Sequence, residues 1–360
     1  MKTGISRFSR RSFLWGAGAL AAAPMLGQQA LGQQTTALSA APASKSVVGV
    51  VHGEDRRRNI YESLLSIEEQ ILPILKTKKC VVLKPNLVST VNQVAATHAD
   101  ALRGILDFLA PRFKGPIFIA ESAAGRTWEG YDNFGYTKLP AEYKPLEVKL
   151  IDLNEEGKYQ VFPILSGDLH PVPVRLAARL LDPEAFILCA AVMKTHNVVV
   201  ATLSVKNMTL GAPLRSAPKE TPRWNDKRHY HGGVRQTHFD ILLTAQKMKP
   251  FWGATVIDGF EGMEGNGPTS GQPVPSRLAI ASTDLIAADR VGVEAMGINP
   301  DWVGYLKFCS QAGIGQYDLS KIEIRGPQLA GLVKKYELHG DLERQLQWMG
   351  PLEEIPPKLG

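Results

Sequence analysis

Cysteine is scarce in this chain, with only three among its 360 residues. Cys80, Cys189 and Cys309 are far apart, and no two of them form a Cys-x-x-Cys motif. This spacing argues against an iron–sulfur cluster held by the chain's own cysteines. Because Cys80 and Cys189 lie in apolar runs typical of buried strands, we expect buried, unpaired thiols instead.

The chain also lacks an apolar run long enough for an ordinary membrane-spanning helix. The nearest candidate is an Ala- and Gly-rich run ending near Leu26, which follows the segment Ser9-Arg10-Arg11-Ser12-Phe13-Leu14. An arginine pair before a short apolar run is typical of a twin-arginine export signal, whereas a disordered basic tail is the alternative. We therefore predict that residues 1–44 are a signal peptide and linker recognised by the twin-arginine translocase. The processed protein should be periplasmic or secreted, without a stable membrane span.

A strong charge of one sign is absent from the rest of the chain. The sequence has 41 Lys and Arg against 35 Asp and Glu, for a net charge of +6. Four of the basic residues and none of the acidic ones lie in residues 1–44, so the remainder has a net charge of about +2. This balance gives no electrostatic reason to expect nucleic acid as a partner.

Several motifs that would indicate a reaction are missing. The chain contains no Walker A motif, no Gly-x-Ser-x-Gly elbow, no His-Glu-x-x-His helix and no EF-hand loop. It also lacks a Gly-x-Gly-x-x-Gly fingerprint after its first predicted strand. Candidate sites must therefore be found from the positions of polar residues relative to the predicted strands.

Apolar strands that alternate with helices predict an α/β fold. Because the strands are apolar throughout, they are typical of a sheet buried on both faces. We predict a single three-layer domain over residues 45–330, with a mainly parallel or mixed sheet and helices on both faces. The predicted strands are 46–51, 79–84, 116–120, 148–152, 185–192, 254–257, 277–281 and 321–325. The predicted helices are 59–75, 99–109, 174–181, 237–249, 284–296 and 305–312.

Other segments carry more specific expectations. Residues 331–360 should form a helical tail packed on the domain, with an amphipathic helix pair over 329–349. Thr97 and Asp284 are placed to cap the helices that follow them. The aromatic segment 125–143 is either a lid over the strand ends or an ordered surface excursion, and the irregular segment 212–236 is either functional or disordered.

Polar side chains follow four predicted strands at the point where each strand ends. In chain order they are Lys84 with Asn86, Glu121 with Ser122, Lys194 with His196, and Asp258 with Glu261. Because the carboxyl ends of parallel strands share one edge of a sheet, these residues should converge in one crevice. A single lysine in such a position is usually only a solvated surface group.

The segment from Met193 to Gly211 adds more polar residues near the same edge. Periodicity does not decide whether residues 200–208 are helix or strand. Thr202 and Lys206 face the same way in either case, because a spacing of four suits both. Asn207 follows Lys206 directly, so this segment contributes several candidate ligand-binding groups.

Lysines gathered at one edge favour an anionic ligand. Lys84, Lys194 and Lys206 would repel one another and lower each other's pKa values, which a bound anion would relieve. Gly267, in the glycine-rich segment 259–271, could add backbone N–H groups to such a site, and plain turn-forming glycines are the alternative.

A divalent metal ion is a further possibility. His229, His231 and Asp258, with His196, could supply nitrogen and oxygen ligands. Their spacing is not diagnostic of a metal site, so the cofactor stays unknown at this stage.

Many of these residues belong to a wider pattern. The matching pieces are Lys84-Pro85-Asn86, Glu121-Ser122, Gly135-Tyr136, Lys194-Thr195-His196, Thr202, Lys206-Asn207, Gly211, Asp258-Gly259, Glu261-Gly262, Gly267-Pro268, Gly271, Asp284, Asp289 and Met296-Gly297. In order and spacing, these pieces resemble the family catalogued as domain of unknown function 362, over roughly residues 46–300. Some members of that family carry a ferredoxin-like, Cys-rich appendage, which suggests a redox setting, but this chain lacks it. The resemblance implies a shared site made of Lys84, Asn86, Lys194, His196, Lys206 and Asn207.

The functional expectation is an exported enzyme, of oxidoreductase or isomerase type, that acts on a small anionic substrate. Lys84 and Lys206 would bind the anion, and Asn86 and Asn207 would orient it. Lys194 and His196 would move protons, with Lys206 counted among the catalytic residues. Further ligand-binding residues would be Glu121, Ser122, Thr202 and Gly267. The alternative is a non-catalytic periplasmic protein that binds an anionic ligand or a metal in the same crevice, and a partner-binding role is a third.

Overall fold

The structure is a computed structural model that describes residues 45–350. The predicted signal peptide and linker, residues 1–44, and the end of the predicted tail, residues 351–360, lie outside the described residues. Over residues 45–350, none of the helices is long and apolar enough to cross a membrane.

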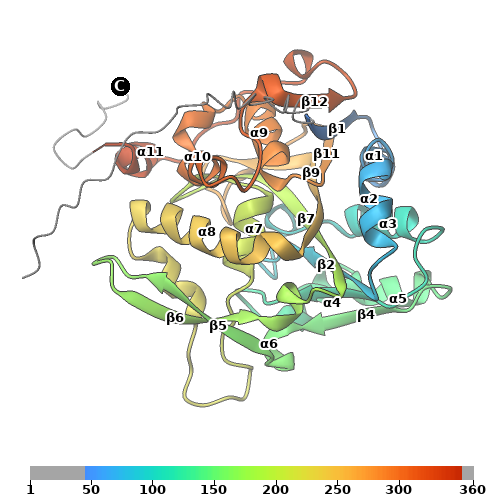
Figure 1. Ribbon diagram of the computed structural model, residues 1–360, viewed down its shortest axis with the longest axis horizontal. Helices are drawn as coiled ribbons and strands as arrows, with labels where there is room; N and C mark the ends of the chain where they lie inside the picture. Colours follow the sequence, from blue (N-terminus) through green and yellow to red (C-terminus); the bar gives the residue numbers. More distant parts are fainter. Residues whose placement is uncertain (1–44, 351–360) are drawn as a thin grey trace, which may run out of the picture. The chain divides into compact units, whose positions relative to one another are not determined.

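A ten-stranded sheet forms the centre of the described chain (Figure 1). Its strands lie in the order β12-β1-β11-β9-β7-β2-β3-β4, with β8 paired to β7 and β10 paired to β9. Neighbours are parallel except at β11, β8 and β10, so the sheet is mixed and mainly parallel. The strands are β1 (Ser46–His52), β2 (Cys80–Pro85), β3 (Ile117–Glu121), β4 (Val148–Asp152), β7 (Ala185–His196), β8 (Val200–Thr202), β9 (Trp252–Glu264), β10 (Gln272–Val274), β11 (Leu278–Ser282) and β12 (Ile322–Arg325).

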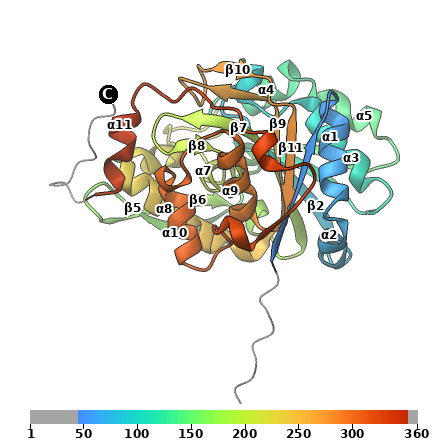
Figure 2. The same cartoon turned by 90° about the horizontal axis from the view of Figure 1, so that it is seen from above.

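Both faces of this sheet are buried, as the uniformly apolar strands predicted. Along β7, Ile187 and Cys189 pack into one hydrophobic core, while Phe186 and Leu188 pack into the other. Figure 2 shows α1, α2 and α3 on one side of the sheet and α7 to α10 on the opposite side. These helices are α1 (Arg56–Leu65), α2 (Glu68–Leu75), α3 (Ala99–Leu109), α7 (Ser204–Gly211), α8 (Val234–Met248), α9 (Leu285–Ala295) and α10 (Gly304–Gln311). The predicted three-layer α/β fold is confirmed.

Shorter elements connect the layers. They are α4 (Thr127–Asn133), α5 (Leu139–Glu142), α6 (Leu153–Glu156), α11 (Leu342–Gln345) and the 3₁₀ turns η1 (Gln93–Ala95), η2 (Tyr136–Lys138), η3 (Ala178–Leu181), η4 (Asp226–His231), η5 (Lys249–Phe251), η6 (Pro300–Trp302), η7 (Leu319–Lys321), η8 (Leu329–Gly331) and η9 (Leu346–Trp348). A separate hairpin joins β5 (Tyr159–Leu165) to β6 (Pro171–Ala177). The helix predicted over 174–181 is therefore wrong, because pairing with β5 prevails over local helix propensity.

Three other local predictions need correction. The helix expected over 59–75 is two helices, α1 and α2, separated at Ser66, whose hydroxyl donates to the carbonyl of Ser63. Helix α3 is capped by His98, not by Thr97. The amphipathic helix pair over 329–349 is reduced to η8, α11 and η9, because residues between them run alongside the sheet, where Gly265 N donates to the carbonyl of Glu337.

Strands β7 and β9 are longer than the sequence predicted. Strand β7 continues past Val192 to His196, and β9 continues past Ile257 to Glu264. The two extensions pair with each other and with the short strands β8 and β10, so their polar residues remain in the sheet. Residues 200–208 prove to be a strand followed by a helix.

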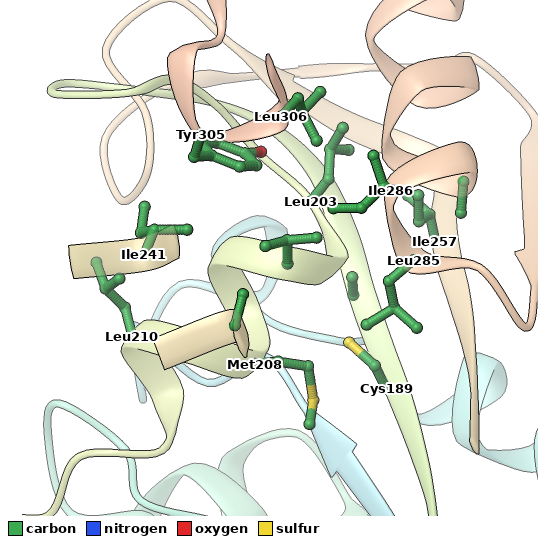
Figure 3. Close-up of a cluster of buried hydrophobic side chains, with 14 of the residues drawn as sticks. Cys189, Leu203, Met208, Leu210, Ile241, Ile257, Leu285, Ile286, Tyr305 and Leu306 are labelled. Atoms are coloured by element: carbon green, nitrogen blue, oxygen red, sulfur yellow. The ribbon is translucent and has the colours of Figure 1, made fainter. Parts of the chain in front are cut away.

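Helix α7 is anchored on all sides by packing and by a carboxylate. Figure 3 shows Met208 and Leu210 of this helix beside Cys189 of β7 and Ile241 of α8. At its N-terminus the two oxygens of Asp289, from α9, accept the N–H groups of Ser204 and Val205 at 2.7 and 2.9 Å. This anchoring gives α7 one fixed position against the strand ends.

The two irregular segments are also ordered. In the aromatic segment 125–143, Tyr131 and Tyr136 are fully buried, and Tyr131 donates to the carbonyl of Ile151 on β4. It is thus a packed excursion and not an open lid. Segment 212–236 contains η4 and the start of α8, and it brings Lys227 towards α7.

Candidate functional site

A small polar cavity lies where β2 and β3 end, beside α7. Its volume is about 60 Å³, enough for several water molecules or a small polar ligand, since one water needs roughly 10–15 Å³. The cavity is lined by Lys84, Asn86, Leu87, Val88, Glu121, Ser122, Ala124, Lys206, Asn207, Leu210, Gly211 and Lys227. Of the residues predicted for the site, Lys84, Asn86, Glu121, Ser122, Lys206 and Asn207 converge here.

A buried ion pair forms the floor of the cavity. Lys84 Nζ lies 2.8 Å from Glu121 Oε2, and both side chains are almost completely buried. The second oxygen of Glu121 accepts the N–H of Ser122 at 2.8 Å. A β-carbon at Gly211 would overlap Lys84 Nζ, so the pair depends on glycine at that position. Parallel pairing of β2 and β3 brings the two charges together, as predicted from their strand ends.

Two asparagines link this ion pair to a second buried lysine. Asn207 Oδ1 accepts from Lys84 Nζ at 3.1 Å and from Asn86 Nδ2 at 3.0 Å. Asn86 Oδ1 in turn accepts from Lys194 Nζ at 2.6 Å. Lys194 also donates to the carbonyl of Ala95 at 2.7 Å and does not line the cavity. It therefore acts on the site through Asn86.

Burial holds the pKa of Lys194 well below its ordinary value. The positive charge of Lys206 lowers this pKa further, while the charge of Glu121 raises it. Desolvation disfavours the charged form of an amine, which is the main cause of the shift.

Lys206 is the third residue of α7, and its side chain lines the cavity. Its side chain is buried, with 7% of the residue exposed. Within residues 45–350, the Nζ of Lys206 makes no hydrogen bond or ion pair. The Nζ atoms of the other two lining lysines, Lys84 and Lys227, both donate hydrogen bonds. Burial, followed by the charge of Lys84, lowers the pKa of Lys206 to about 7.

Lys227 is a lining residue that sequence reasoning missed. From η4 its Nζ donates to Ser122 Oγ at 2.8 Å and to the carbonyls of Gly211 and Leu210 at 3.1 and 3.3 Å. Burial lowers its pKa to about 7, although the charge of Glu121 opposes this. The only signal in the sequence was that Lys227 lies in the long, Lys- and Arg-containing segment 212–236.

The cavity therefore combines three lysines with one carboxylate, and that carboxylate is already paired. When Lys206 and Lys227 are protonated, the lining has an excess of positive charge. An anion is the ligand that would offset this charge most directly.

Besides Lys194, three of the predicted catalytic and ligand-binding residues lie outside the cavity lining. His196 Nδ1 accepts the N–H groups of Val198 and Val199 at 3.0 and 3.3 Å, and burial holds its pKa well below the ordinary value. Thr202 pairs with Lys194 across β7 and β8, and its buried hydroxyl has no partner within residues 45–350. Gly267 donates its N–H to the carbonyl of Gly265 and packs against Thr195.

The predicted metal ligands are not gathered in one place. Asp258, on β9, is buried and lies 3.2 Å from Arg56 Nε. His229 and His231 are exposed in η4. Within the part of the chain that the structure describes, no group of three or more His, Cys, Asp or Glu side chains is arranged to hold a metal ion. The three cysteines are all buried and unpaired, as predicted.

Taken together, these elements define an α/β protein with a lysine-lined polar pocket at the ends of two of its parallel strands. A family model described as domain of unknown function (DUF362) matches residues 81–294. The chain belongs to this family.

Two further likenesses accompany the family match. The thylakoid-associated protein sll1697 of Synechocystis sp. (strain ATCC 27184 / PCC 6803 / Kazusa) is 25% identical over 225 residues, which cover 61% of this chain and 64% of that protein. The match thus spans less than two thirds of the relative's length. A crystal structure of a Thermotoga maritima protein matches 72% of this chain and 60% of that chain, at 12% identity and a TM-score of 0.38. A likeness at this score establishes neither fold nor function.

Proposed function

We propose that this protein is an exported enzyme acting on a small anionic substrate held between Lys206 and Lys227. The observation that carries this proposal is Lys206, whose side chain is largely buried in the cavity lining and whose amine has no hydrogen-bond partner within residues 45–350. An ammonium group that is largely buried and has no protein partner loses part of its hydration, and an anion in the cavity would offset that loss. Lys227 adds a second positive charge on the neighbouring wall, where its Nζ donates to Ser122 Oγ.

The pocket favours proton-transfer chemistry of the isomerase type, with an oxidoreductase as the other reaction class. Neutral Lys206 can accept a proton from the bound substrate, and its pKa of about 7 suits a general base near neutrality. We assign this step to Lys206 and not to His196, because His196 Nδ1 already accepts backbone N–H groups. Lys194 keeps Asn86 in place, and Asn86 and Asn207 orient the substrate.

Calorimetric titration of the protein with inorganic phosphate, and separately with pyruvate, tests the binding part of this proposal. We expect binding at pH 6 that weakens as the pH rises through about 7, because Lys206 and Lys227 lose their charge over that range. Lys206→Met should weaken phosphate binding by about ten- to a hundred-fold, the value of one charge-assisted hydrogen bond.

Lys144→Met is the matched control, because it removes the same side chain from an exposed position. Its phosphate affinity should equal that of the parent protein. Equal phosphate affinity for Lys206→Met, or no binding of either anion, would contradict the proposal. Binding by the parent protein without turnover of any screened substrate would instead favour the non-catalytic binding protein.

A further inference from the structure

Lys206 offers the cavity a nucleophile as well as a charge. The other two lining amines are engaged, because Lys84 Nζ contacts Glu121 and Asn207, and Lys227 Nζ donates to Ser122. Among residues 45–350, Lys206 Nζ has no such contact, although its side chain is buried and lines the same space. An amine in this position can approach a bound molecule without first breaking a bond to the protein.

We propose that Lys206 forms a Schiff base with a small 2-oxo acid, whose carboxylate is held by the positive charge of Lys227. This inference rests on the proposed function, which places an anionic substrate in the cavity. It adds that the substrate has a carbonyl group next to its charge. The cavity volume of about 60 Å³ limits the ligand to a molecule of a few carbon atoms.

The bond-forming step balances with groups already at the site. Neutral Lys206 Nζ bonds to the carbonyl carbon of the 2-oxo acid, and the carbonyl oxygen leaves as water. That oxygen takes one proton from the attacking amine and one from the Lys227 ammonium, which solvent then reprotonates. The product is an iminium ion, which retains one hydrogen on nitrogen and draws electrons from the neighbouring carbon.

The surroundings keep Lys206 in its reactive form. Burial and the charge of Lys84 lower its pKa to about 7. About half of such amines are neutral at pH 7, against fewer than roughly one in a thousand for a solvent-exposed lysine. A neighbouring cation and a desolvated site are the two conditions that activate a lysine for this chemistry.

Borohydride trapping tests the inference directly. The full chain is incubated with pyruvate and then reduced with sodium cyanoborohydride, and the intact mass and the modified peptide are measured. We expect one reduced pyruvate adduct on Lys206, formed at least about ten-fold faster than on any exposed lysine. The rate should be highest near pH 7, because the step needs both neutral Lys206 and protonated Lys227, and inorganic phosphate should suppress it by occupying the cavity.

Variants separate this proposal from the broader one. Lys206→Met should lose the adduct and remain folded by circular dichroism, whereas Lys144→Met should retain the full adduct. If the parent protein binds pyruvate by calorimetry but yields no adduct, the Schiff base is wrong and anion binding stands. An adduct that forms mainly on Lys227 or on exposed lysines, or that phosphate does not suppress, also overturns the proposal. If neither binding nor adduct is found, both proposals fail.

Discussion

Burial lowers the pKa values of Lys206 and Lys227 so far that both amines are about half-protonated at neutral pH. Each has a pKa of about 7, well below that of an ordinary lysine. Each amine binds a proton more weakly in the folded chain than in the unfolded chain. Such lysines reduce the free energy of unfolding at neutral pH, which is a frequent property of functional sites.

Lys206→Met should therefore stabilise the protein while weakening its function. The unfolded chain binds more protons than the folded chain between pH of about 7 and the ordinary lysine value, so the free energy of unfolding rises with pH across that window. Removing the amine should flatten this rise and increase the free energy of unfolding at pH 7 by about 1–3 kcal/mol. Urea unfolding at pH 7 and pH 9 measures both effects.

The outcome for Lys206→Met is compared with Lys144→Met, which should leave the pH dependence and the midpoint unchanged. A loss of stability in Lys206→Met at pH 7 would show that the amine is stabilised in the native state, contrary to its isolation in the cavity.

At the scale of single elements, α7 determines the geometry of the site. It carries both Lys206 and Asn207, and its last residue, Gly211, leaves room for Lys84. Its first two N–H groups bond to Asp289, which comes from α9 on the same face of the sheet. The position of the site amine thus depends on a carboxylate distant in sequence.

Asp289→Ala should loosen the start of α7 and disturb the cavity. The variant leaves the N–H groups of Ser204 and Val205 without their acceptor, at a cost of about 1–3 kcal/mol. We expect phosphate affinity to fall several-fold together with this loss of stability, because α7 carries Lys206 and Asn207, which we propose bind the ligand. Calorimetry and thermal unfolding report the two quantities.

Asp284→Ala provides the comparison at a second helix. Asp284 caps α9 by accepting the N–H groups of Ile286 and Ala287, and it does not line the cavity. It should reduce stability by a similar amount and leave phosphate affinity unchanged. An equal loss of affinity in both variants would mean that general destabilisation, and not the position of α7, weakens binding.

For the whole molecule, the predicted export signal and the fold are compatible. The cysteines in residues 45–350 are buried and unpaired, so the fold does not depend on an oxidising compartment for disulfides. A protein exported in the folded state can acquire its cavity before it crosses the membrane. The proposed location, outside the cytoplasm, follows from residues 1–44.

Replacing both Arg10 and Arg11 with lysine should block export. The arginine pair is the part of the predicted signal that the translocase reads, so the full-length precursor should accumulate in the cytoplasm. Cell fractionation followed by mass determination of the product measures this. Arg7→Lys, which leaves the arginine pair intact, should be exported normally. Export of the paired variant at the normal level would mean that these arginines are not the signal.

The sequence alone determined the layered fold and half of the site. Uniformly apolar strands require cover on both faces, and parallel strands place their carboxyl ends at one edge. These two rules predicted that Lys84 with Asn86 and Glu121 with Ser122 would meet, whereas the family resemblance implied that Lys206 and Asn207 belong to the same site. Every strand predicted from the apolar runs is present, although β7 and β9 run further than those runs, and β5, β6, β8 and β10 were not predicted.

Only the tertiary structure decided which polar groups face the cavity and in what state. The contact of Lys227 with Ser122 joins residues 105 positions apart, and that of Lys84 with Asn207 joins residues 123 positions apart. Local patterns contain no information on such distances. Local patterns also did not show that His196 and Gly267 use their polar groups in hydrogen bonds to nearby backbone. Burial and neighbouring charge set the pKa of Lys206, and both arise only when distant segments pack together.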